Sequence, residues 1–247
     1  MTNVDHLFVF MLLIVQPIYG LVSYRRYLAR IKAGQPTDRV SMYRWTGITQ
    51  WIALAVLMTA WYWLDRPYSD LGFVRAEGTG FFIGIALLIS ACGFLLYAWH
   101  RTKTMTADEK SKQVQALGDL VHFLPRNSED LSAFFKLSLT AGCVEETIYR
   151  GFLLWYLGLV MPLWAAVVAS SILFALGHSY QGVGGVIKTG LVGLSFGALY
   201  VLTGSIWLPI LAHILLDALQ GPAIVEVLRE DLPPATQPSQ NDASARD

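Results

Sequence analysis

Long apolar runs dominate this 247-residue sequence and restrict what the chain can fold into. A helix rises about 1.5 Å per residue and the hydrocarbon core of a bilayer is about 30 Å thick, so roughly 20 mostly apolar residues make one crossing. Hydrophobic residues make up 54% of the chain and charged residues only 15%, whereas soluble domains carry about 25% charged residues. The pattern predicts a polytopic membrane protein with the lipid bilayer as its solvent.

Seven segments have the length and composition of a membrane span, or nearly so. They run approximately over residues 7–24, 45–64, 80–99, 131–157, 162–177, 185–202 and 206–228. We therefore predict an all-α transmembrane bundle of about seven spans, divided into an N-terminal three-span region with cytoplasmic loops (1–130) and a four-span core (131–230). Residues 231–247 hold too little apolar surface to order themselves and are predicted to form a disordered tail.

Basic residues are distributed unevenly among the predicted connectors. Six Arg or Lys residues follow the first span and five follow the third, whereas the connector between these two carries only Arg66 and Arg75. The positive-inside rule then predicts an N-terminus outside the cell and, after seven spans, a cytoplasmic C-terminus. We expect an integral protein of the bacterial inner membrane. Its 18 basic and 18 acidic residues balance, so charge gives no indication of a nucleic-acid partner.

Several ionisable side chains lie inside the last four predicted spans. Such groups are costly in hydrocarbon unless they pair with one another or face water, so they mark the place where function is expected. They are Glu145, Glu146, Arg150, His178, His213 and Asp217.

Helical geometry separates the two adjacent glutamates. Arg150 follows Glu146 by four residues and lies nearly on its face, whereas Glu145 points about 140° away from Arg150. We therefore predict that Arg150 pairs with Glu146 as structural support, while Glu145 keeps no obvious counter-charge and suits a general base. The alternative is that all three side chains form a buried ion network that only fixes helix packing.

The two histidines add polar groups from other predicted spans. Asp217 follows His213 by four residues, so its carboxylate can orient the imidazole. Together with Glu145, the histidines could supply the base and the oxyanion donor that amide hydrolysis requires. Straight spans would place Glu145 and His213 roughly 10 Å below the outer boundary and His178 near the inner one. A common site therefore requires a short, tilted or broken fifth span.

Three motifs on successive apolar segments resemble those of the CPBP intramembrane protease family, which includes the type II CAAX prenyl endopeptidases and the Abi-type bacteriocin-immunity proteins. The resemblance covers about residues 131–230, and the first three spans carry no family signal. The motifs are Glu145-Glu146-x-x-x-Arg150, Phe174-x-x-x-His178 and His213-x-x-x-Asp217.

This resemblance implies an intramembrane endopeptidase that cleaves a membrane-associated or lipidated protein or peptide. It implies that Glu145 activates the attacking water with help from His178, and that His213 and Asp217 stabilise the oxyanion. The commonest form of the pattern has Asn at the position of Asp217, and an ionised Asp cannot donate a hydrogen bond. Either Asp217 is protonated or it orients His213 and leaves the donation to that ring; we favour the second.

Two other hydrolytic chemistries are open to these residues. Glu145, His178 and His213 could bind Zn²⁺ with an open position for water, although the chain has no His-Glu-x-x-His motif, and these spacings do not decide whether a metal is required. A Gly-x-Ser-x-Gly sequence at 193–197 could indicate a serine nucleophile. It lies within a predicted helix rather than on a strand-to-helix turn, so helix packing is the simpler interpretation.

Two non-enzymatic functions use the same kinds of residue. A transporter or proton relay would also place carboxylates and histidines inside the membrane, but inverted repeats are expected of many transporters and none is visible here. A membrane scaffold could use the polar cluster to hold a partner helix. Loss of function in an isosteric Glu145→Gln variant would distinguish an enzyme from a scaffold.

Overall fold

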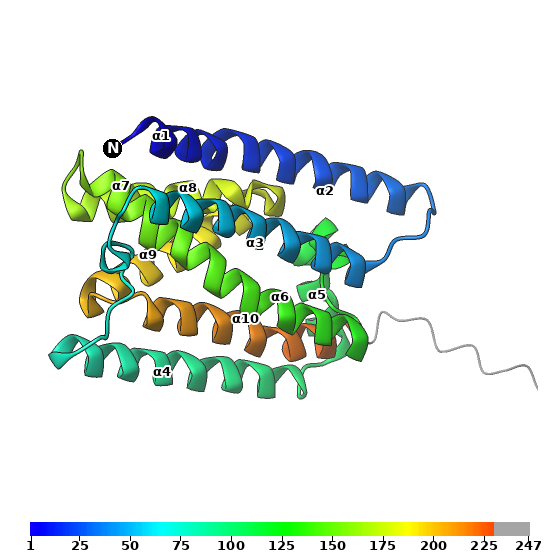
Figure 1. The fold of residues 1–247 in the computed structure, drawn as a ribbon. Helices are drawn as coiled ribbons and strands as arrows, with labels where there is room; N and C mark the ends of the chain where they lie inside the picture. The colour runs from blue at the N-terminus through cyan, green and yellow to red at the C-terminus, as the bar shows by residue number, and fades with distance from the viewer. Residues whose placement is uncertain (230–247) are drawn as a thin grey trace, which may run out of the picture.

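The computed structural model describes residues 1–229 as helices joined by short connections, with no strand in that part of the chain (Figure 1). The prediction of an all-α fold is confirmed. The predicted tail, 231–247, lies outside the described residues.

The α-helices are α1 (Asn3–Phe10), α2 (Gln16–Lys32), α3 (Arg39–Trp63), α4 (Gly78–Thr102), α5 (Ala107–Leu117), α6 (Ser128–Glu146), α7 (Leu154–Gly158), α8 (Leu163–Gly177), α9 (Gly182–Thr203) and α10 (Trp207–Leu228). Short π or 3-10 turns are η1 (Met11–Val15), η2 (Tyr68–Leu71), η3 (Gly118–His122), η4 (Thr147–Leu153) and η5 (Ser179–Gln181).

Polar caps set the starts of several helices. The Asp38 side chain accepts from the Ser41 backbone N–H at the start of α3, and the Asn127 side chain accepts from the Asp130 N–H at the start of α6. Each bond satisfies a backbone donor that the first turn would otherwise leave without a partner. At the C-terminal end of α9, Gly204 adopts a left-handed conformation that ends the helix before α10 begins.

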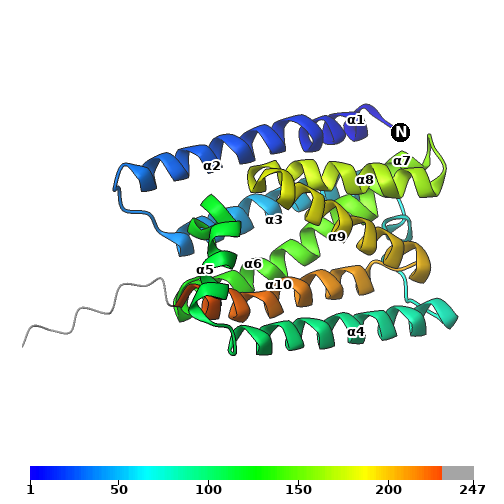
Figure 2. The ribbon, with the colours of Figure 1, turned by 180° about the vertical axis from the view of Figure 1, so that it is seen from behind.

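The long helices pack side by side with their axes roughly aligned (Figures 1 and 2). α6 lies between α3 and α10, and α10 packs on its far side against α4. α8 and α9 form a second antiparallel pair that packs against the rest of the bundle through η4 and α10. The N-terminal region therefore contacts the C-terminal core directly, through α3 and α4.

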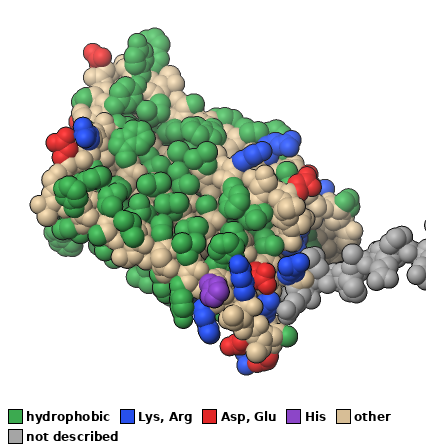
Figure 3. Space-filling model, turned by 90° about the horizontal axis from the view of Figure 1, so that it is seen from below, with side chains coloured by type: hydrophobic (Ala, Val, Ile, Leu, Met, Phe, Trp, Pro, Cys, Tyr) green, Lys and Arg blue, Asp and Glu red, His purple; other side chains and the backbone are tan. Residues whose placement is uncertain are grey.

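Four helical segments are long and apolar enough to cross a membrane. They are Asn3–Lys32, Gly78–Thr102, Ser179–Thr203 and Trp207–Leu228, and Leu163–Gly177 is a shorter apolar helix. Apolar side chains cover much of the face seen in Figure 3. On α4, Phe82, Ile89 and Phe94 are each about two-thirds exposed. Such a surface suits a lipid environment. The prediction of about seven spans is compatible with this helix order.

The α8–α9 connection is the feature of the fold that matters most for the site. α8 has 15 residues and a rise of only about 22 Å. In Figure 1 the turn from α8 into α9 lies well short of the right-hand ends of α3, α6 and α10. The end of α8 therefore lies at an intermediate depth of the bundle, which is the short fifth span that a common site requires.

Candidate active site

The first motif lies where α6 passes into the π-helical turn η4. α6 and η4 form one continuous helix, and every residue of η4 is buried. π-turns inside α-helices are frequent at functional sites. Arg150 Nη1 donates to Glu146 Oε1 at 2.9 Å, with both side chains almost completely buried, so the predicted ion pair is confirmed.

Arg150 is held from three directions. Its Nη2 donates to the Gly193 carbonyl of α9 at 2.9 Å, and its guanidinium lies over the rings of Phe174 and Phe196 at 4.5 and 5.5 Å. A Cβ at Gly193 would lie 3.2 Å from Arg150 Nη2. The glycine thus allows α9 to approach closely enough for its backbone to accept from the arginine.

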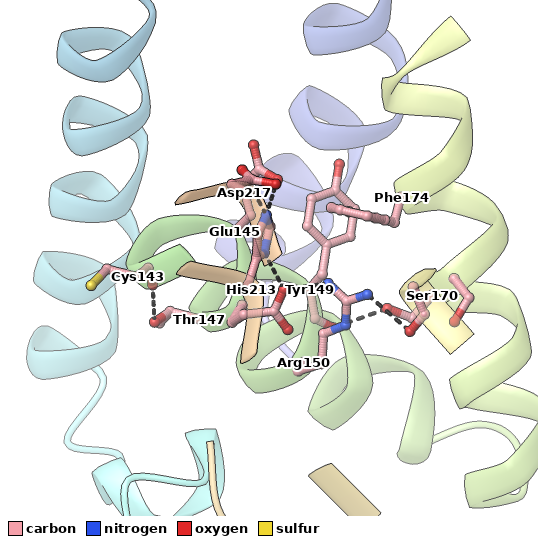
Figure 4. Close-up of polar contacts among 12 residues, drawn as sticks. Cys143, Glu145, Thr147, Tyr149, Arg150, Ser170, Phe174, His213 and Asp217 are labelled. Carbon is pink, nitrogen blue, oxygen red and sulfur yellow. Dashed lines mark hydrogen bonds and ion pairs between the residues drawn. The ribbon is translucent and has the colours of Figure 1, made fainter. Parts of the chain in front are cut away.

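His213 of α10 lies at the centre of the cluster (Figure 4). Its Nδ1 donates to Glu146 Oε1 at 2.7 Å, since a carboxylate oxygen can only accept. On the opposite edge of the ring, Nε2 lies 3.7 Å from Asp217 Oδ2 and 4.0 Å from Glu145 Oε2. We expected Asp217 to orient this ring, but the carboxylate that accepts from Nδ1 is that of Glu146. Asp217 instead lies on the same side as Glu145, because the ring reaches across from α10 to α6.

Glu145 is the carboxylate without an arginine, as the helix geometry predicts. Its side chain is 12% exposed, whereas that of Glu146 is fully buried. Gln50 of α3 donates from Nε2 to Glu145 Oε1 at 2.7 Å. Gln50 is not among the candidate residues singled out from the sequence. An amide side chain inside an apolar predicted span was the signal that could have identified it.

His178 follows the last residue of α8 and lies beside the cluster. Its Nδ1 donates to the Phe174 carbonyl at 2.8 Å, and a neutral ring with this bond leaves Nε2 free to accept a proton. The Phe174 ring lies 4.8 Å from the His178 ring and 6.2 Å from the His213 ring. Asp217 interacts electrostatically with both histidines and with Glu145. The short α8 thus brings His178 to the depth of the other site residues.

The alternative zinc set does not fit this arrangement. Within residues 1–229, no group of three or more His, Cys, Asp and Glu side chains is placed to hold a metal ion. Each histidine is held through Nδ1, His213 by Glu146 and His178 by the Phe174 carbonyl, so both rings have a fixed orientation.

The Gly-x-Ser-x-Gly sequence lies inside α9, as the sequence analysis anticipated. Ser195 is exposed and its hydroxyl donates to the Leu191 carbonyl of its own helix at 3.0 Å. Gly193 and Gly197 instead face neighbouring helices, where a Cβ at Gly197 would lie 2.8 Å from the Val167 side chain. The glycines serve helix packing, and the serine points away from the cluster.

The fold and the cluster define a class of protein: a helical integral membrane protein with a buried carboxylate and histidine site. Residues 127–219 match a family model described as type II CAAX prenyl endopeptidase Rce1-like. Over this region, which is less than half of the chain, the protein is similar to that family. No curated protein and no solved structure matches the chain.

The matched region includes all six ionisable residues singled out in the sequence. It begins at the cap of α6 and ends two residues after Asp217, so it contains α6, η4, α8, α9 and the first part of α10. Gln50 lies outside it. The description of the matched family is that of an endopeptidase.

Proposed function

We propose that the protein is an intramembrane endopeptidase that hydrolyses a peptide bond of a membrane-associated or lipidated protein or peptide, with Glu145 activating the attacking water. One observation carries this proposal. Glu146 is occupied by Arg150 and His213, whereas Glu145 directs an oxygen at the other edge of the same histidine ring, 4.0 Å away. A purely structural ion network would need only the first carboxylate.

In the proposed reaction, Glu145 first accepts a proton from water and later returns it to the leaving amine. Glu145 Oε2 takes a proton from water, and the hydroxide oxygen adds to the scissile carbonyl. His178, whose Nε2 can accept, helps to hold that water. Negative charge then develops on the carbonyl oxygen, and collapse of the tetrahedral intermediate breaks the C–N bond while Glu145 returns the proton to the leaving amine.

His213 is proposed to stabilise the oxyanion through Nε2–H. Three carboxylates surround its ring. That of Glu146 lies at Nδ1, and those of Glu145 and Asp217 lie near Nε2. A ring that donates to Glu146 through Nδ1 and carries a second proton on Nε2 can donate that proton's hydrogen bond to the oxyanion. Asp217, with a side chain 32% exposed, is proposed to adjust this charge from the more open side of the site.

The decisive experiment compares wild type with Glu145→Gln, which keeps the shape of the side chain but removes the base. We expect the variant to fold and to lose about 10²–10⁴-fold in kcat. Glu129→Gln, at an exposed position in the first turn of α6, is the matched control and should retain full activity. A farnesylated peptide with a C-terminal CaaX sequence, presented in vesicles to the purified protein, is the first probe.

A comparison of new protein N-termini in membranes from cells producing each variant removes the dependence on a chosen peptide. N-termini that appear with wild type and Glu129→Gln but not with Glu145→Gln would identify the substrates. Equal sets of N-termini for all three folded proteins, together with equal turnover of the peptide, would contradict the proposal and favour a scaffold or proton relay.

The membrane orientation remains part of this proposal. The distribution of Arg and Lys predicts an external N-terminus and a cytoplasmic C-terminus in the bacterial inner membrane. The test replaces the two native cysteines, Cys92 and Cys143, by serine and introduces one cysteine at exposed Gln35 or exposed Glu77, which is then reacted with a membrane-impermeant maleimide. Only the second should react in intact cells.

A further inference from the structure

We propose that Gln50 is a positioning residue for hydrolysis: its amide holds one oxygen of Glu145 so that the other faces His213 and the attacking water. This inference rests on the proposed role of Glu145 as the base. It extends the site to α3, which lies outside the region matched by the family model.

The two oxygens of Glu145 have different neighbours. Gln50 Nε2 donates to Oε1 at 2.7 Å, whereas Oε2 is the atom 4.0 Å from His213 Nε2. A glutamate side chain has three rotatable bonds, so one contact on α10 leaves its carboxylate free to turn. The second contact, from α3 on the other side of α6, restricts that rotation and presents Oε2 to the histidine.

Burial of this amide is costly, which favours a functional reason for its presence. Gln50 Oε1 is buried and has no hydrogen-bond partner among the described residues. A buried acceptor without a partner destabilises the fold, and an aliphatic side chain of similar size would avoid that cost. The buried Oε1 of Gln50 therefore lowers the stability of the fold, while its Nε2 makes a short hydrogen bond to Glu145.

The neutral charge of Gln50 also suits the role. The titratable groups that face Glu145 are His213 and Asp217 from α10 and Tyr180 from η5, with Glu146 and Tyr149 on its own helix. A lysine or arginine at position 50 would form an ion pair with Glu145 and reduce its tendency to take a proton from water. An amide fixes the carboxylate without supplying a full positive charge.

Two substitutions of similar size separate positioning from simple packing. Gln50→Met removes the donor, and Gln50→Glu replaces it with a second acceptor of nearly identical shape. Because the lost hydrogen bond is to a charged group, we expect kcat to fall about 10-fold in Gln50→Met and about 100-fold in Gln50→Glu, with KM unchanged in both. Thr49→Val is the matched control, since Thr49 is the exposed neighbour on α3 and its hydroxyl donates to the Thr46 carbonyl of its own helix.

The pH dependence of Gln50→Glu provides a readout that packing would not change. A protonated carboxyl at position 50 can again donate to Glu145, whereas an ionised one repels it. We therefore expect the activity of Gln50→Glu, relative to wild type at the same pH, to recover as the pH is lowered. Gln50→Met has no group that could restore the bond, so its relative activity should show no such recovery.

The rates are measured on the farnesylated peptide and expressed per folded molecule, and three outcomes decide the inference. The predicted ranking with recovery of Gln50→Glu at low pH supports it. Equal kcat in wild type and Gln50→Met overturns it, as does a loss expressed only in KM. If Gln50→Glu fails to fold, the split between kcat and KM in Gln50→Met decides alone. Wild-type activity that is unaffected by Glu145→Gln overturns the proposed function itself, which distinguishes the two failures.

Discussion

Two buried acid–arginine pairs in this protein are built from the same kinds of side chain and are completed in different ways. At one end of the bundle, Arg66 binds both oxygens of Asp5, at 2.6 and 2.8 Å, and lies over the rings of Trp61 and Trp155, at 5.0 and 4.7 Å from their centroids. The second oxygen of Asp5 also accepts from the backbone N–H of Thr2, at 2.6 Å. This pair joins α1 to the segment after α3, and each carboxylate oxygen has a donor.

The pair in the centre of the bundle is left incomplete. Arg150 and His213 both donate to Oε1 of Glu146, while Oε2 is buried without a hydrogen-bond partner among the described residues. A second carboxylate, Glu145, lies on the other edge of the same histidine. A pair that serves stability satisfies all its polar atoms, whereas the central cluster keeps acceptors available at a cost in stability. That difference is what is expected of a site where protons move.

The largest expected contrast comes from removing the negative charge in each pair. In Glu146→Gln, His213 loses the carboxylate that accepts from its Nδ1 and fixes the ring, so we expect kcat to fall about 10²-fold or more. Asp5→Asn lies far from the cluster and should leave kcat per folded molecule unchanged. Each variant breaks a buried pair and should lower the free energy of unfolding by about 3 kcal/mol or more.

Both quantities are measurable on the same detergent-solubilised samples, by peptide cleavage and by chemical unfolding. A loss of kcat in Asp5→Asn similar to that in Glu146→Gln would mean that the two pairs act through the same global loosening, and the distinction between them would fail.

A smaller effect is expected where α9 approaches Arg150. In Gly193→Ala, the added methyl group would lie 3.1 Å from the Phe174 ring and 3.2 Å from Arg150 Nη2. Overpacking of this kind costs about 1–3 kcal/mol of stability, and displacement of Arg150 should also lower kcat. Thermal unfolding and peptide cleavage measure the two effects.

Gly184→Ala is the matched control because it lies on the same helix with open space around its Cβ position. Alanine is the better helix former, so this variant should be as stable as wild type or slightly more stable. Equal behaviour of the two alanine variants would show that Gly193 is not needed for the close approach.

Sequence patterns predict those parts of the site that depend on one helix. The Glu146–Arg150 pair follows from a spacing of four residues, and the apolar runs give most helix bounds to within a few residues. The partner of His213 could not be predicted in this way. Arg150 already satisfies the charge of Glu146, and nothing in α6 indicates that a ring from α10 shares the same oxygen.

Gln50 and His178 show two further limits of the sequence. The bond between Gln50 and Glu145 joins residues 95 positions apart, so it depends on how α3 packs against α6. For His178, an apolar run gives the length of a helix but not its depth in the bundle. The 15-residue α8 brings His178 to the site because its turn stops partway along its neighbours.

The smallest expected effect concerns the one position where the chain departs from the commonest family pattern. Asp217 Oδ2 lies 3.7 Å from His213 Nε2, beyond hydrogen-bond distance, and its side chain is the most exposed of the acids around the ring. Asn fits the same space, can donate to an oxyanion, and removes one of three negative charges near His213. These effects oppose each other, so we expect kcat of Asp217→Asn within about threefold of wild type. Asp217→Leu, which offers neither charge nor donor, should lose about 10-fold. A loss of 100-fold in Asp217→Asn would instead show that the carboxylate itself transfers a proton. Asp217 would then share the role of base with Glu145, and Glu145 would no longer be the one carboxylate of the cluster that moves protons.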